Sequence, residues 1–124
     1  MNIVDSSGWL AYFADEINAK HFMAPLSNPT KLIVPAITIY EVFKVILRES
    51  SENEALQAAV AMQKGEVIDL NTSLALAAAR LSLEYRLPMA DSIILATAQE
   101  CNAIIWTQDS DFKNIPNVKY FSKK

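Results

Sequence analysis

Short apolar runs alternate along the chain with longer segments of helical periodicity. Five runs of three to five residues have the apolar and β-branched character of strands, at residues 2–4, 32–34, 66–70, 103–106 and 118–121. Between them, apolar residues recur every three to four positions, which predicts helices. These predicted helices lie around residues 9–13 and at 18–26, 36–49, 54–64, 72–86 and 92–101.

Residues that start or stop helices agree with these boundaries. Pro35 is well placed at the start of a helix, and Gly65 is a natural stop. Asn71 caps the next helix, which Pro88 ends. Alternation of short strands with helices predicts βαβ units, and therefore a mainly parallel sheet covered by helices on both faces.

Length, composition and charge limit the function classes. A chain of 124 residues with 52% apolar residues is expected to form one domain with a sizeable core. The net charge of −3 argues against a module that coats nucleic acid with a basic surface, but not against an enzyme that meets phosphates through bound cations.

Cysteine and histidine counts narrow the chemistry further. The single Cys101 cannot form an internal disulfide, and the N-terminus has no signal peptide, so we expect a cytoplasmic protein. No apolar run is long enough to span a membrane. The chain has one cysteine and one histidine, His21, which excludes a zinc site built from several cysteines and histidines.

Several carboxylates are expected at one edge of the sheet. Asp5 and Asp109 directly follow predicted strands, and Asp111 lies two residues further on. Glu41 and Asp91 lie early in helices, and right-handed connections would bring them to the same edge. Ligands of such sheets bind outside the carboxyl ends of the strands.

Each acid taken alone has an ordinary explanation, but their convergence does not. Aspartates before helices are common caps. Glu41 lies inside an apolar helix, where its charge needs a boundary position, an ion pair with Lys44 or another partner. Oxygen ligands without imidazole or thiolate select Mg²⁺ or Mn²⁺, and such a site suits hydrolysis of phosphate esters by an activated water.

Four motifs in order resemble the PIN domain family, and within it the VapC-type toxins of prokaryotic toxin–antitoxin pairs. The motifs are residues 3–7, 35–42, 90–98 and 106–112. The resemblance spans nearly the whole chain. It implies a single PIN domain over residues 1–124, with a three-layer α/β/α sandwich around a mainly parallel sheet of four to five short strands.

The resemblance also implies a site and an activity. It implies an acidic quartet that binds Mg²⁺ or Mn²⁺, with a fifth acid that binds a second metal or assists through water, and two hydroxyls that orient these groups. The quartet is Asp5, Glu41, Asp91 and Asp109. The fifth acid is Asp111, and the two hydroxyls belong to Ser6 and Thr107. The implied activity is metal-dependent endoribonuclease. The implied partners are an RNA substrate, a VapB-like antitoxin that blocks the acidic pocket, and a second copy in a homodimer.

Other surfaces of the chain are compatible with such partners. Two early helices carry large apolar residues that suit core packing, and an exposed subset in a groove would suit a partner helix. They are Trp9, Tyr12, Phe13, Phe22, Met23 and Leu26. Four basic side chains are either solvated or face RNA, namely Lys44, Arg48, Arg80 and Arg86.

Three other functions stay open at this point. A non-catalytic interaction module would share the fold without turnover. An aspartyl-phosphate enzyme fits poorly, because Ser7 stands where a phosphatase has a second aspartate, and no late lysine suits a receiver domain. A DNA-directed nuclease would use the same acids, but the chain has no room for a helical arch or added DNA-binding elements.

Overall fold

The computed structural model describes residues 1–123, and its helices and strands follow the alternation expected from the sequence. The elements are β1 (Asn2–Val4), α1 (Ser6–Phe13), α2 (Ala19–Leu26), the 3₁₀ turn η1 (Pro29–Lys31), β2 (Ile33–Pro35), α3 (Ala36–Glu49), α4 (Glu52–Met62), β3 (Glu66–Ile68), α5 (Thr72–Tyr85), α6 (Met89–Cys101), β4 (Ile104–Thr107), the 3₁₀ turn η2 (Ser110–Phe112) and β5 (Val118–Tyr120).

Every strand pair in the described residues is parallel. β4 pairs with both β1 and β5, and β2 pairs with β3. A single parallel bridge between Asn2 and Leu32 joins the two groups, so the strands follow the order β3-β2-β1-β4-β5. This confirms the predicted parallel sheet of four to five short strands.

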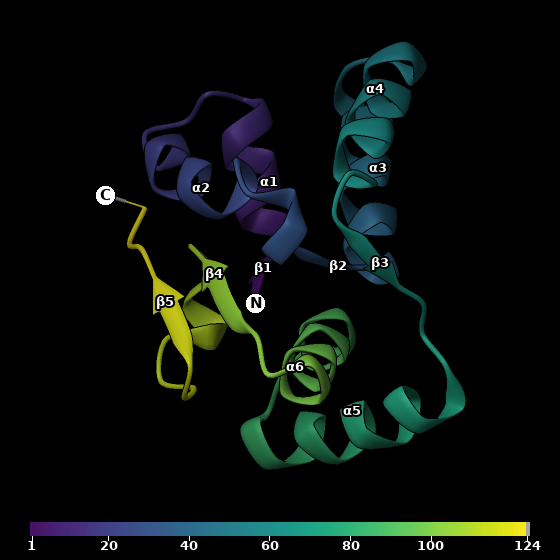
Figure 1. Cartoon of the computed structure of the whole chain (residues 1–124), viewed down its shortest axis with the longest axis vertical. Helices are drawn as coiled ribbons and strands as arrows, with labels where there is room; N and C mark the ends of the chain where they lie inside the picture. Colours follow the sequence, from purple (N-terminus) through teal and green to yellow (C-terminus); the bar gives the residue numbers. More distant parts are fainter. Residues whose placement is uncertain (124) are drawn as a thin grey trace.

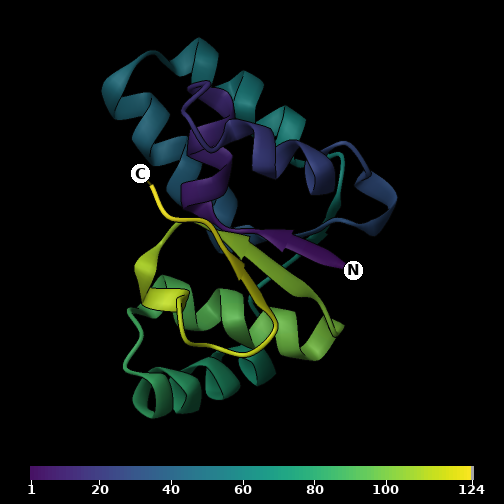
Figure 2. The ribbon, with the colours of Figure 1, turned by 90° about the vertical axis from the view of Figure 1, so that its left-hand side faces the viewer.

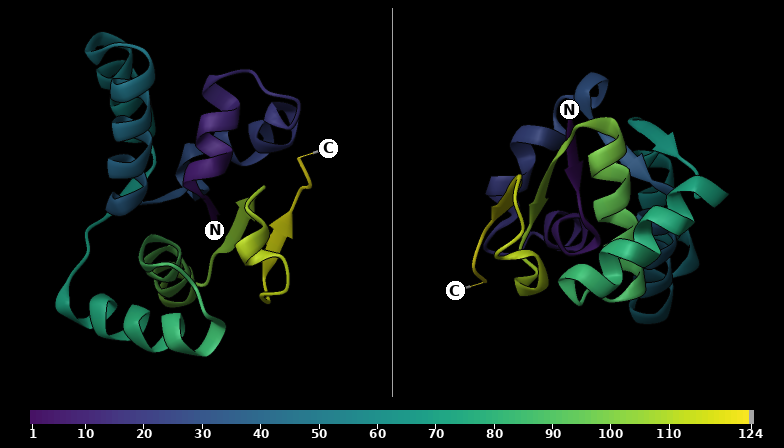
Figure 3. Two further views of the ribbon diagram at one scale, coloured as in Figure 1. Left: turned by 180° about the vertical axis from the view of Figure 1, so that it is seen from behind. Right: turned by 90° about the horizontal axis from the view of Figure 1, so that it is seen from below.

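Helices cover both faces of the sheet, as Figures 1 and 2 show. Successive strand residues face opposite layers, because side chains alternate along a strand. Ile3 belongs to the core beneath α5 and α6, whereas Val4 belongs to the core beneath α1 to α4. Figure 3 shows α5 and α6 together on one side of the strands. The predicted three-layer α/β/α sandwich is therefore confirmed.

Most predicted boundaries differ from the observed ones by one to three residues, and the starts of two helices have a clear local cause. Helix α6 begins at Met89, so Asp91 lies in its first turn rather than before it. Pro88, with a φ of −57°, has an extended ψ and ends the preceding connection directly before the helix. Helix α4 also begins earlier, at Glu52, because the Ser51 hydroxyl caps it through the amide of Glu54.

Gly8 allows α1 to lie against β1 and α2. A Cβ at this position would come within 2.6 Å of Val4 Cγ1 and 2.9 Å of Phe22 Cε1, and both side chains are fully buried. We expect Gly8→Ala to lower the free energy of unfolding by about 1–3 kcal/mol through overpacking, measured by urea unfolding. The control is Ser73→Ala at an exposed position of α5, which should change stability by less than about 0.5 kcal/mol. Equal stabilities of the two variants would contradict this packing.

Candidate metal centre

The ends of β1 and β4 place two aspartates side by side. β1 and β4 are parallel neighbours, with Val4 opposite Trp106. The amide of Asp5 donates to the carbonyl of Trp106 at 3.1 Å, so the chain leaves both strands at the same edge. Asp109 follows β4 and caps the short turn η2. The predicted convergence of these strand exits is thus observed.

Three carboxylates come close enough to share one cation. Asp91, Asp109 and Asp111 each offer an oxygen, and these atoms all lie within 4.8 Å of one another. Asp109 Oδ1 also accepts from the amide of Asp111 at 2.9 Å, which fixes the turn that carries both side chains. Asp91 reaches the group from the first turn of α6.

Asp5 is buried beside this group and held by several donors. Its Oδ1 accepts from the Ser7 hydroxyl at 2.8 Å and from the Gly8 amide at 3.0 Å. Its Oδ2 accepts from the Thr107 hydroxyl at 2.7 Å. Burial nevertheless raises the pKa of Asp5 to about 6, against the lowering effect of these hydrogen bonds. Asp5 is therefore both the cap of α1 and part of the acidic group.

Glu41 finds its partner on α1. Its Oε1 accepts a hydrogen bond from the hydroxyl of Ser6. The Lys44 ammonium, the ion-pair partner considered from the sequence, lies 5.6 Å from the centre of the Tyr40 ring. The two hydroxyls expected near the acids are thus both present, Ser6 on Glu41 and Thr107 on Asp5.

The carboxylates repel one another. Burial first, and then the charge of Asp109, followed by those of Asp5, Glu41 and Asp111, raises the pKa of Asp91 to about 8. All five acids singled out in the sequence therefore interact at one place. A divalent cation would offset this repulsion, and a site of carboxylate oxygens without thiolate or imidazole fits Mg²⁺ or Mn²⁺.

Sequence reasoning overlooked Ser7. Its hydroxyl donates to Asp5, accepts from the amide of Gln108 at 3.3 Å, and lies 3.4 Å from the hydroxyl of Thr107. The available signal was its position two residues after a helix-capping aspartate, where a short side chain can reach back to the carboxylate. Ser7 thus links the exits of β1 and β4.

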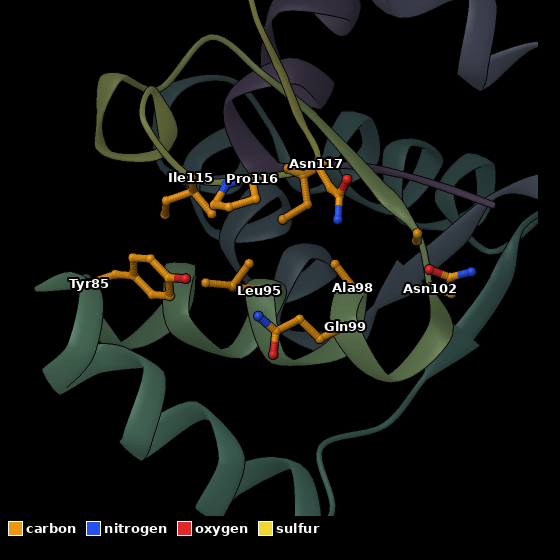
Figure 4. Close-up of a pocket in the computed structure, with 10 residues that line it drawn as sticks. Tyr85, Leu95, Ala98, Gln99, Asn102, Ile115, Pro116 and Asn117 are labelled. Carbon is orange, nitrogen blue, oxygen red and sulfur yellow. The ribbon is translucent and has the colours of Figure 1, made fainter.

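Two cavities lie apart from the five carboxylates of the acidic edge. The first, of about 190 Å³, lies between α6 and the loop before β5, and no acid lines it. Figure 4 shows it between the side chains of Tyr85, Leu95 and Pro116. The second is an open groove of about 680 Å³ bounded by α1, α3 and α4.

None of the helices in residues 1–123 is long and apolar enough to cross a membrane.

Comparison with solved structures finds the same fold in toxin–antitoxin proteins. A toxin–antitoxin complex from Klebsiella pneumoniae matches at 26% identity and a TM-score of 0.81, covering 98% of this chain and 99% of that one. VapC20 from Mycobacterium tuberculosis, a toxin that cleaves the sarcin–ricin loop, matches at 16% identity and a TM-score of 0.77, covering 95% and 97%. A DNA-bound VapBC from Salmonella typhimurium matches at 15% identity and a TM-score of 0.74, covering both chains fully.

Sequence comparison identifies the family. No curated protein matches this chain by sequence. The family model of the PIN domain, however, matches residues 3–118, which include all five carboxylates. The model spans most of the chain, and the parallel sheet with its acidic edge agrees with it. The protein therefore belongs to the PIN domain family.

Proposed function

We propose that this protein is a metal-dependent nuclease that hydrolyses RNA phosphodiester bonds. The observation that carries the proposal is the convergence of five carboxylates around Asp91 at the edge where β1 and β4 end. Caps and turns account for single aspartates, but they do not account for three carboxylate oxygens within 4.8 Å of one another, nor for a site where burial and then the neighbouring acids raise the pKa of Asp91 to about 8. Such a cost is typical of a functional site.

The roles of the residues follow from their contacts. Asp91, Asp109 and Asp111 would hold an Mg²⁺ or Mn²⁺ ion, since their oxygens lie close enough to share one. Asp5 and Glu41 complete the negative site, each held in place by a hydroxyl from Thr107 or Ser6. The ion, when bound, supplies the positive charge that draws a phosphodiester to this acidic edge and activates a water.

RNA is the proposed substrate rather than DNA. The Mycobacterium tuberculosis protein of the same fold is described as cleaving the sarcin–ricin loop. A DNA-directed nuclease with the same acids and a non-catalytic module of the same fold are the alternatives. The acidic convergence favours an enzyme over the module, because a binding module has no use for mutually repelling carboxylates.

The deciding experiment offers purified protein mixed pools of RNA and of single-stranded DNA. With Mg²⁺ or Mn²⁺ present, we expect RNA to be cut and DNA to survive, and EDTA to stop the cutting. Cutting of DNA alone would favour the DNA-directed nuclease. Survival of whole-cell RNA and tRNA under both metals would favour the non-catalytic module.

We also propose that a VapB-like antitoxin inhibits the protein, and that the protein acts as a homodimer in the cytoplasm. Solved structures of the same fold include a toxin–antitoxin complex and a VapBC complex. The groove between α1 and the α3–α4 pair offers an apolar floor with Leu10, Phe13 and Ile46, and a rim with several acids. These rim acids are Glu16, Glu49 and Glu54. An apolar partner helix with basic flanks fits such a groove.

A charge on the groove floor should weaken antitoxin binding. We expect Val45→Glu, on the floor of the groove, to weaken binding of the proposed VapB-like antitoxin by at least about tenfold, because an unpaired carboxylate would be buried under the partner helix. Isothermal titration calorimetry measures the change. Leu83→Glu, at an exposed position of α5 outside the groove, is the control and should bind the antitoxin normally. Unaltered binding by Val45→Glu would place the antitoxin elsewhere.

A further inference from the structure

Four side chains form a continuous row along the edge strand β5, and we call this row the edge strip. It consists of Lys119, Trp106, Phe121 and His21. The Lys119 ammonium lies 4.3 Å from the centre of the Trp106 ring. Trp106 and Phe121 stack with centroids 6.0 Å apart, and His21 lies parallel to Phe121 at 4.5 Å. The three rings are half-buried, and Lys119 is exposed.

The strip is held rigidly from below. Phe121 meets the fully buried Phe22 edge-on at 5.6 Å. The Trp106 indole N–H donates to Asn2 Oδ1 at 2.9 Å. Because these contacts fix the rings in one arrangement, the protein loses little conformational entropy when a ligand stacks on them.

The strip begins beside the carboxylates. The amide of Phe121 donates to the carbonyl of Thr107 at 2.9 Å, and the Thr107 hydroxyl donates to Asp5. Among the described strands, β5 pairs only with β4 and leaves its other side open. Figure 1 shows the chain running from the end of β5 towards α2, which carries His21. One polymer could therefore touch both the acidic site and the strip.

Charge is segregated around the strip. No aspartate or glutamate follows Asp111, although the chain has 14 acids and a net charge of −3. The same segment carries the lysines at positions 113, 119, 123 and 124. Lys20 is exposed beside His21 on α2. The segment after Asp111 is therefore basic within an acidic protein, and its exposed lysines are complementary to the phosphates of a polyanion.

We propose that the edge strip binds an unpaired stretch of the RNA substrate next to the scissile bond. A nucleobase stacks on the face of the His21 ring that points away from Phe121, which extends the row of stacked rings by one, and the adjoining phosphates lie near Lys119 and Lys123. Proteins hold single strands with this combination of aromatic rings and cations. Closure of the core explains the contact of Phe121 with Phe22, but it does not explain half-buried rings beside an acid-free basic segment. The inference rests on the proposed nuclease function.

The test measures binding separately from cleavage. The Asp91→Asn protein is titrated into a fluorescein-labelled, unstructured RNA oligonucleotide in Mg²⁺, and fluorescence anisotropy follows binding at several salt concentrations. His21→Ala and Lys119→Gln are added singly in this background. We expect His21→Ala to weaken binding about tenfold through lost stacking. We expect Lys119→Gln to weaken binding and to reduce the slope of log K against log salt by about 1.

Lys64→Gln is the matched control, because it removes an exposed lysine at the other end of the strand order, just before β3. It should leave both affinity and salt slope unaltered. Circular dichroism checks folding, and Lys119→Gln decides the question if His21→Ala unfolds. Strip variants that bind RNA like the control would overturn the proposal, as would strip variants that lose only antitoxin binding. RNA cleavage by the unmutated protein reports on the nuclease function independently.

Discussion

Replacing Asp91 by asparagine is expected to abolish metal-dependent RNA cleavage while making the metal-free protein more stable. Asparagine keeps the size of the side chain but removes the charge at the centre of the five acids. An ion held by the remaining ligands would be bound more weakly and placed less well. We expect cleavage to fall by at least about a hundredfold, measured as initial rate at saturating Mn²⁺.

The gain in stability has a separate cause. Burial and neighbouring acids raise the pKa of Asp91 to about 8, so at neutral pH the folded state disfavours the charge that the unfolded chain carries freely. Asparagine removes this cost, and we expect the free energy of unfolding in EDTA to rise by about 1–3 kcal/mol after allowance for solvent screening. Urea unfolding measures it.

Asp69→Asn is the matched control for both measurements. Asp69 is exposed after β3 and lies outside the acidic group, so its amide should alter neither cleavage nor stability beyond about 0.5 kcal/mol. An Asp91→Asn protein that lost stability together with activity would show that the carboxylate holds the fold together. That result would contradict the assignment of Asp91 to a metal centre.

The sequence was informative wherever a single rule of strand topology decided where a residue lies. Parallel strands end at a common edge, so the positions of Asp5 and Asp109 directly after strands were enough to predict that they meet. Asp91 was assigned to the right helix but to the position directly before it, whereas α6 begins at Met89 after Pro88 and Asp91 lies in its first turn. Both Pro88 and Asp91 are residues that commonly start a helix, and the sequence alone does not show which of the two does so here.

The remaining features depend on contacts between distant parts of the chain. Glu41 was recognisable as a costly charge in an apolar helix, but its partner Ser6 is 35 residues away. Thr107 meets Asp5 across 102 residues. The edge strip likewise brings His21 against Phe121, which no local periodicity indicates. Such pairings follow from strand order and helix placement, which only the folded chain defines.

The stability of the metal-free protein is expected to fall as pH rises from about 4 to about 8. The ordinary aspartate pKa is 3.8, whereas the pKa of Asp91 is raised to about 8 and that of Asp5 to about 6. Between these limits the folded protein binds more protons than the unfolded chain. Raising the pH therefore favours unfolding, with both groups contributing up to about pH 6 and Asp91 alone above it.

A divalent cation should reverse this loss, and more strongly at high pH than at low pH. Metal ligands must be deprotonated, so Mn²⁺ competes with protons for Asp5 and Asp91 below their raised pKa values. At about a hundred times its Kd, Mn²⁺ should add about 2.7 kcal/mol to the free energy of unfolding. Urea unfolding near pH 5 and near pH 8, with EDTA or Mn²⁺, measures both effects. The Asp91→Asn protein should show a flatter pH profile in EDTA and a smaller response to Mn²⁺. If the unmutated protein instead gained stability between these pH values in EDTA, or showed no gain from Mn²⁺ near pH 8, either result would mean that the five carboxylates do not form a metal centre. An acidic group that holds a cation must be destabilised by its own charge when the cation is removed.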